Sequence, residues 1–297
     1  MKTNNKAGLN YLIPKVTLLQ ESGLGTSEFA GRTAYQSFDK SENQQIKELN
    51  NLLNMDDIDD LVINNNIKKI HKTDNSKLLD SLAWVFHHHS VIEMCNLTYS
   101  IRGISRANLV EISRHRIGIS LTVKSTRYTM QPIINAFLAE KTCNDNTYPS
   151  DWFFEAINSL NVFITTDKEY NRLQIIDMYN KLSYQYDSIG RDEFLGNTIV
   201  KEAKEWLTTA EEDRDTIFNY LQDSKTKRNS GDTLKHIVND NWATDMVINF
   251  NLRSLKHFLD LRLNNAAWFQ IRELSKQIVK ATPEKYLSLI LKDHRTS

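Results

Sequence analysis

Two stretches near the middle of the chain alternate strictly between apolar and polar side chains. The first runs from Cys95 to Arg102, and the second runs from Ile119 to Lys124. A period of two is typical of a strand with one buried face, and Gly103 is expected to end the first strand. Most other apolar residues recur at helical spacing. We therefore predict an α+β fold, in which a small antiparallel sheet is flanked by long helices and carries a helical insertion.

Shorter patterns predict the other elements of the first half. Ser41 and Gln44 have the spacing of a capping box ahead of apolar residues at helical intervals, which indicates the start of a helix. In chain order we expect a strand at 15–19, a helix at about 42–54, a turn at 64–66, a helix from about 74 and a short helix at about 105–114.

The second half is predicted to be almost entirely helical. Residues from 133 to about 231 carry apolar side chains at helical intervals among many charged ones, which indicates an insertion or lid-like subdomain. A further helical region is expected at roughly 232–292. Only four prolines and nine glycines occur in 297 residues, so we expect few loops. We expect a single domain over 1–297, with the helical insertion at about 133–231.

Composition argues against several classes of protein. Lys+Arg and Asp+Glu both number 37, and a formal net charge of zero argues against a general nucleic-acid binder. No apolar run approaches the ~18 residues of a membrane span, and the N-terminus lacks the apolar stretch of a signal peptide, so we expect no membrane partner. Cys95 and Cys143 are too few for a disulfide framework. We expect a soluble, cytoplasmic protein.

The zero net charge conceals a local excess of positive charge. Between Met94 and Gln131, six Lys or Arg residues stand against Glu111 alone, an excess of five over 38 residues. Arginine suits bidentate contact with phosphate oxygens, and small hydroxyl residues such as Ser125 lie among these side chains. The pattern indicates a site for an anionic ligand. A solvated basic face or a set of internal ion pairs is the alternative.

A second group of candidates lies on a helix that is expected to begin near Asn249. Four of its side chains fall on one helical face: Asn251, Leu255, Phe258 and Arg262. A guanidinium at the end of an apolar stripe can polarise a carbonyl where negative charge develops in a transition state. Alternatively, Arg262 reaches the surface or pairs with Asp260 or Glu273.

Three consecutive histidines, His87 to His89, do not favour a metal site. Neighbouring side chains point in different directions, and no HExxH or CxxC motif accompanies them. We expect no metal; one histidine of the loop is expected to meet a ligand instead. The chain also lacks a GxSxG elbow, a GxGxxG fingerprint and a Walker loop, so a nucleotide would be held in another way.

Several motifs, in order, resemble those of the flavin-dependent thymidylate synthases. The central match is Arg114-His115-Arg116 followed by Ser125-Thr126-Arg127-Tyr128, similar to the family's Arg-His-Arg and Ser-x-Arg-Tyr signature. The flanking matches are RTAYQSF at 32–38, HHSVIE at 88–93, IRGISRA at 101–107, NLRSL at 251–255, FLDLR at 258–262 and AWFQIR at 267–272. The resemblance covers roughly 30–131 and 232–282.

The resemblance implies an enzyme that methylates dUMP reductively to dTMP. Methylenetetrahydrofolate would supply the carbon, FAD would carry the hydride, and NADPH would be the reductant. It also implies an α+β core assembled as a homotetramer, with FAD and dUMP bound where subunits meet. The expected partners are therefore small molecules and further copies of the chain, with no nucleic acid.

The resemblance also assigns roles position by position. The matched flavin-binding positions are Ser37, His88, Arg114, His115, Arg116 and Asn251, with His257 where the family often has a flavin-contacting asparagine. The matched dUMP-binding positions are Ser125, Arg127 and Tyr128, with Glu111 in place of a usual glutamine and Lys235 in place of an arginine. Arg262 matches the catalytic arginine that contacts the uracil and activates it.

Departures from the family pattern leave two alternatives open. Eight residues separate Arg116 from Ser125 where seven are usual, and Val123 replaces a common glutamate. A degenerate family member that binds FAD without synthase activity is one alternative. A nucleic-acid-binding protein is the other, and it would need stacking aromatics, for which Tyr99 and Tyr128 are the candidates nearby.

Overall fold

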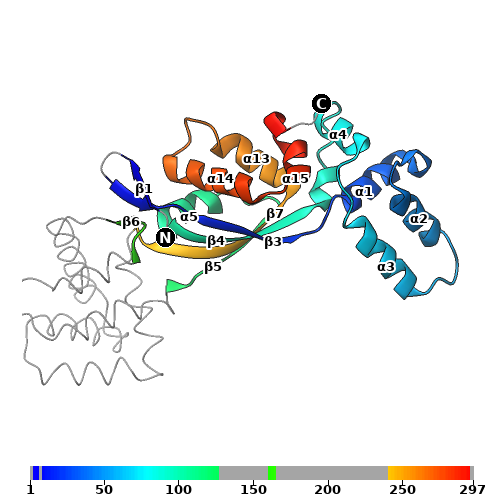
Figure 1. Cartoon of the computed structure of the whole chain (residues 1–297), viewed down its shortest axis with the longest axis horizontal. Coiled ribbons are helices and arrows are strands. Elements are labelled where there is room, and N and C mark those ends of the chain that lie inside the picture. The colour runs from blue at the N-terminus through cyan, green and yellow to red at the C-terminus, as the bar shows by residue number, and fades with distance from the viewer. Residues whose placement is uncertain (1–2, 7–8, 127–159, 165–239, 295–297) are drawn as a thin grey trace, which may run out of the picture. The chain divides into compact units, whose positions relative to one another are not determined.

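The computed structural model describes residues 3–6, 9–126, 160–164 and 240–294 (Figure 1). These residues fall into two units, each described here by itself. The first comprises the described parts of 1–13, 103–107 and 123–244, and the second comprises 14–102, 108–122 and 245–294. Across these described segments, no helix has the length and apolar character that a membrane crossing requires.

A four-stranded sheet, most of whose residues belong to the second unit, confirms the predicted α+β class. Its strand order is β3-β4-β7-β5, for which the bounds are β3 Lys15–Glu21, β4 Asn96–Ser105, β7 Ala243–Asn251 and β5 Ile119–Val123. β3 pairs antiparallel with β4, and Lys15 lies opposite Arg102. On β4 the predicted alternation is confirmed, because Leu97, Tyr99 and Ile101 are fully buried.

Two predictions about strands were wrong. Gly103 lies inside β4 rather than ending it, since glycine tolerates the φ of +79° found there and the strand continues to Ser105. The region 232–292 was predicted to be helical throughout, yet β7 occupies Ala243–Asn251. Its buried Met246, Ile248 and Phe250 alternate with less buried neighbours, a period of two that sequence reasoning overlooked.

Three C-terminal helices lie on one side of this sheet (Figure 1): α13 Leu252–Arg262, α14 Phe269–Ala281 and α15 Glu284–Ile290, followed by the short η4 Lys292–His294. Aromatic contacts join sheet and helices, because the Phe250 ring lies 5.4 Å from that of Phe258 and 6.3 Å from that of Tyr99. The predicted helical region is divided here, since an exposed Ala266 lies in the turn between α13 and α14.

Four helices precede the sheet's second strand: α1 Gly25–Tyr35, α2 Gln44–Leu53, α3 Asp60–Ile70 and α4 Lys77–Trp84, with the short η1 Phe38–Lys40 and η2 Val91–Met94. The turn predicted at 64–66 was wrong, because these residues lie in the middle of α3. That helix is capped by Asp59, and its Ile63, Ile67 and Ile70 pack against α2 in an apolar cluster.

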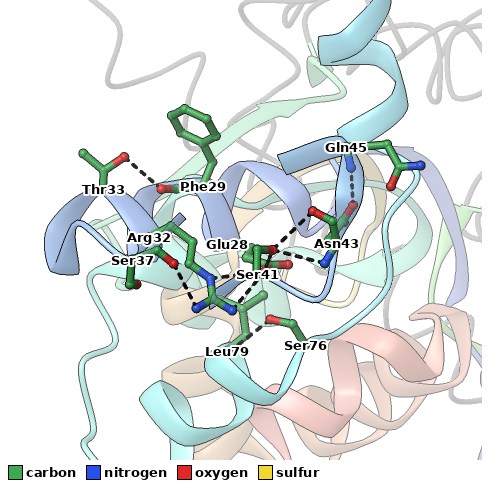
Figure 2. A network of polar contacts seen from close by, with 10 residues as sticks. All are labelled: Glu28, Phe29, Arg32, Thr33, Ser37, Ser41, Asn43, Gln45, Ser76 and Leu79. Atoms are coloured by element: carbon green, nitrogen blue, oxygen red, sulfur yellow. Dashed lines mark hydrogen bonds and ion pairs between the residues drawn. The ribbon is translucent and has the colours of Figure 1, made fainter. Parts of the chain in front are cut away.

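The helix predicted at about 42–54 is confirmed as α2, but its predicted cap was wrong. Asn43, rather than Ser41, caps the helix, since its side chain accepts a hydrogen bond from the Gln45 N–H at 3.0 Å. Ser41 instead belongs to a buried network in which its hydroxyl donates to Glu28 at 2.8 Å (Figure 2). The same Glu28 carboxylate pairs with Arg32 at 3.4 Å, and Figure 2 shows Arg32 lying between Glu28 and the Ser37 carbonyl.

The other predicted short elements of the first half are confirmed. The strand at 15–19 is confirmed as β3, the helix from about 74 as α4, and the helix at 105–114 as α5 Arg106–Ser113. The predicted insertion at 133–231 lies outside the described residues except at 160–164. There, Phe163–Ile164 form β6, which pairs with β2 Leu9–Leu12, itself paired with β1 Thr3–Lys6. This small antiparallel sheet in the first unit was not foreseen.

Candidate functional site

The start of α13 anchors the loop that carries the Arg-His-Arg sequence. The Asn251 carboxamide oxygen accepts from the Ser254 N–H at 2.8 Å, and the Asn251 N–H donates to the Gly118 carbonyl at 2.9 Å. The Ser254 hydroxyl donates to the Ile117 carbonyl at 2.7 Å. Gly118 has φ +66°, and a Cβ there would lie 2.2 Å from Asn251 Nδ2, so glycine alone fits. The loop is therefore held rigidly against the helix.

A second segment meets the same helix start. The Leu252 N–H donates to the Cys95 carbonyl at 2.8 Å, and Arg253 forms an ion pair with Glu93 in η2. The histidine loop that precedes η2 is thereby tied to α13 as well. Glu93 from the motif at 88–93, and Ile117 and Gly118 directly after the motif at 114–116, thus converge on residues 251–254.

A polar cluster lies between α5, this loop and the end of α13. Arg262 donates from Nε to Nε2 of His115 at 3.0 Å, and its Nη1 lies 3.2 Å from Glu111 Oε2. Arg114 approaches the other oxygen of the same carboxylate at 3.5 Å. The Arg262 side chain is 20% exposed and that of Glu111 is 29% exposed, whereas Arg114 is 71% exposed. The partners of Arg262 that sequence offered, Asp260 and Glu273, are not the ones it has.

The pKa of His115 is lowered in this cluster, which favours the neutral imidazole. Burial, followed by the positive charges of Arg262 and His257, lowers its pKa, while Glu111 opposes the shift. A neutral imidazole accepts a hydrogen bond on one nitrogen and carries its proton on the other, so acceptance at Nε2 places the proton on Nδ1. The ring lies edge-on to Phe258, with centroids 5.1 Å apart. His115 is therefore a fixed acceptor for Arg262.

His88 lies with a tyrosine that sequence reasoning missed. Its Nδ1 is 2.5 Å from the Tyr35 hydroxyl, and the two rings are nearly parallel, with centroids 6.3 Å apart. His87 has φ +54°, which turns the chain so that the three histidines take different partners; His89 Nε2, for example, bonds the Ala83 carbonyl. The sequence feature that could have identified Tyr35 as a site residue is its position inside the RTAYQSF match.

The structure places the other predicted site residues as follows. Ser37 is buried, and its backbone makes two hydrogen bonds with Arg32. Arg116 and His257 are exposed, and the His257 ring lies 6.2 Å from that of His115. Ser125 is exposed just after β5 and belongs to the first unit. Arg127, Tyr128 and Lys235 lie outside the described residues.

The cluster offers a specific chemistry. Arg262 donates its Nε–H to His115 and forms an ion pair with Glu111 through Nη1. Among the residues that the structure describes, no partner engages Nη2, so this nitrogen can donate to a ligand. A guanidinium fixed in this way can bind a carbonyl or phosphate oxygen without first losing rotamer freedom. In the portion of the chain that the structure describes, no group of three or more His, Cys, Asp or Glu residues is arranged to hold a metal ion.

Comparison of the sequence with known protein families and with curated relatives identifies the family of this chain. The family model described as "Thymidylate synthase complementing protein" matches residues 17–286. The flavin-dependent thymidylate synthase of Campylobacter jejuni is 26% identical over 272 residues, which cover 92% of this chain and 93% of the relative. That of Wolinella succinogenes is 25% identical over 271 residues, which cover 91% of this chain and 94% of the relative.

Solved structures agree in fold. Thymidylate synthase X from Helicobacter pylori, solved with FAD and dUMP, has a TM-score of 0.55 and 20% identity, and the match covers 95% of this chain and all of that one. A second structure of the Helicobacter pylori enzyme has a TM-score of 0.53 and 21% identity, with 94% and 98% covered. Because the family model spans nearly the whole sequence, this chain belongs to the thymidylate synthase complementing protein family.

Proposed function

We propose that this protein is a flavin-dependent thymidylate synthase that converts dUMP to dTMP. Methylenetetrahydrofolate supplies the carbon, and NADPH supplies two electrons, so that dTMP, tetrahydrofolate and NADP⁺ are the products. The observation that carries the proposal is the cluster in which Arg262 lies against His115 and Glu111. The family match and the relatives named flavin-dependent thymidylate synthase support it.

Arg262 is the residue that we assign to activation of the substrate. Its Nη2, which no described residue engages, can donate to a uracil carbonyl oxygen, on which negative charge grows when the ring becomes nucleophilic at C5. No cysteine is needed for this step, which agrees with the lack of a recognisable cysteine nucleophile motif. The proposed dUMP site comprises Glu111, Ser125, Arg127, Tyr128, Lys235 and Arg262.

The proposed flavin site comprises Ser37, His88, Arg114, His115, Arg116, Asn251 and His257. The chemistry of the donors fits FAD, because the exposed guanidinium groups of Arg114 and Arg116 suit a pyrophosphate. The exposed, parallel rings of Tyr35 and His88 suit contact with a planar ring system. Bound FAD would carry hydride between NADPH and the nucleotide.

We further propose a homotetramer with sites where subunits meet. Ile117, in the Arg-His-Arg loop, is 88% exposed, and Leu261, beside Arg262, is 48% exposed. Apolar side chains so close to a polar cluster are suited to burial against another copy of the chain.

We also propose one domain with an insertion at about 133–231, supported by a family match that runs through both units. The buried free thiol of Cys95 supports a reducing cytoplasm.

Spectroscopy and turnover test the proposal. The purified protein should absorb at about 450 nm, as bound flavins do, and NADPH should bleach this band in the absence of oxygen. dTMP should form from dUMP and methylenetetrahydrofolate. Arg262→Ala should retain the flavin band and lose turnover. Protein that stays colourless after incubation with FAD would overturn the proposal.

One structural observation favours a second candidate, a family member that binds FAD without synthase activity. Glu111 pairs with Arg262 and so neutralises part of the charge that substrate activation needs. A protein with a flavin band that NADPH bleaches, but with no dTMP formed at any dUMP concentration, would establish this alternative.

A further inference from the structure

The Glu111 carboxylate contacts two arginines that belong to different motifs. Its Oε2 lies 3.2 Å from Arg262 Nη1 at the end of α13, and its Oε1 lies 3.5 Å from Arg114 Nη1 in the loop after α5. One carboxylate therefore bridges the helix and the loop. Since Glu111 and Arg262 are mostly shielded from water, this pair is screened less than an exposed ion pair.

Arg262 is held from a second side as well. His115 accepts its Nε–H at 3.0 Å, and the imidazole is itself packed against Phe258. Two acceptors on different parts of the chain define the plane and the direction of the guanidinium. A long side chain without such partners would populate several rotamers, and only some of them would meet a substrate.

A second carboxylate near Arg262, on α13 itself, does not contact the Arg262 guanidinium. Asp260 lies two residues before Arg262, but its carboxylate pairs with Lys256 at 3.6 Å along the helix surface and is 53% exposed. It provides a matched control, because removing it changes the charge of the same helix end without touching the partners of Arg262.

We propose that Glu111 is a positioning residue, whose carboxylate holds the Arg262 guanidinium in the orientation in which it meets the nucleotide. This inference rests on the proposed function for its consequence in turnover. It predicts that the acceptor oxygen at position 111 matters more than the negative charge, because an amide oxygen can also accept from Arg262 Nη1.

Steady-state kinetics of Glu111→Ala, Glu111→Gln and Asp260→Ala test the inference. Glu111→Ala should retain the flavin band and lower kcat by roughly 10- to 100-fold, the loss expected when a mostly buried arginine loses one charged partner, with a smaller change in the KM for dUMP. Glu111→Gln should recover most of the lost kcat, and Asp260→Ala should match the wild type. Equal impairment of both Glu111 variants, or an unimpaired Glu111→Ala, would overturn the inference.

Melting temperatures provide a test that does not depend on turnover. Glu111→Ala, Arg262→Ala and the double variant form a cycle. If Glu111 holds Arg262, the double variant should lose less in melting temperature than the sum of the two single losses. Additive losses would overturn the inference whether or not the protein makes dTMP, whereas the proposed function fails only through the absence of flavin or of turnover in the wild type.

Discussion

The Nε–H of Arg262 donates to Nε2 of His115 at 3.0 Å, across 147 positions of the chain. This hydrogen bond joins the end of α13 to the Arg-His-Arg loop, so the protonation of His115 and the orientation of Arg262 are linked. A second imidazole proton would turn Nε2 from an acceptor into a donor and place a positive charge beside the guanidinium.

Acid should destabilise the protein through His115. Its pKa is lowered below the ordinary 6.5 by burial and by the charges of Arg262, His257 and Arg114, against the opposing charge of Glu111. The unfolded chain therefore takes up the proton first. The stability that neutral His115 contributes is present above pH 6.5 and is lost as the pH falls from there through the folded pKa.

Melting temperatures measured from about pH 8 to about pH 5 test this expectation, because that range spans the ordinary histidine pKa. The wild type should lose melting temperature below about pH 6.5 more steeply than His115→Gln. His71→Gln, which alters an exposed histidine outside the site, should follow the wild type. Superimposable profiles for the wild type and His115→Gln would contradict the prediction.

Gly118→Ala should loosen the Arg-His-Arg loop. The new Cβ would lie 2.2 Å from Asn251 Nδ2 and 2.3 Å from Ser254 Oγ, and the residue would keep a positive φ. We expect a loss of about 2–4 kcal/mol in the free energy of unfolding, from strain and displaced contacts together. Urea denaturation measures it.

Gly103→Ala is the matched control for that variant. Its φ of +79° is similar, but among the described residues other than its two chain neighbours no atom lies within 4 Å of the added Cβ. It should therefore cost only the conformational strain, about 1–2 kcal/mol. Equal losses for the two variants would show that contact with Asn251 does not matter.

Tyr35→Phe should weaken flavin binding without changing the fold. The hydroxyl at 2.5 Å from His88 Nδ1 is lost, while the parallel ring remains. One hydrogen bond of about 1 kcal/mol corresponds to a roughly fivefold rise in the dissociation constant for FAD. Absorbance titration measures the constant, and circular dichroism checks the fold. An unchanged dissociation constant for FAD would show that the Tyr35 hydroxyl does not contribute to flavin binding.

Glu28→Gln should be strongly destabilising. Glu28 and Arg32 are 1% and 7% exposed, and the substitution leaves the guanidinium charge buried without its counter-charge (Figure 2). We expect a loss of about 3–5 kcal/mol in the free energy of unfolding. Glu42→Gln, which breaks the exposed pair with Lys77, should leave the denaturation midpoint unchanged. Similar behaviour of both variants would refute the distinction.

Local sequence patterns predicted correctly those helices and strands in which the spacing of apolar residues matches the face that the fold buries. The alternation that ends at Arg102 is confirmed in β4, because each apolar side chain there meets the core that the C-terminal helices complete. Predictions failed where tertiary packing overrode a local signal. Asn66 lies within α3 because the isoleucines around it pack against α2, and Ser41 bonds Glu28 instead of capping a helix.

The motifs by themselves determined the family and the candidate residues, since these depend only on which side chains stand in which order. Only the tertiary structure decided which of them touch. The sequence left open whether Arg262 reaches the surface or pairs with Asp260 or Glu273, whereas the fold brings it to His115 and Glu111. The physical reason is that the loop that Gly118 allows brings the residues after α5 to α13, and no spacing along the chain encodes such a non-local contact.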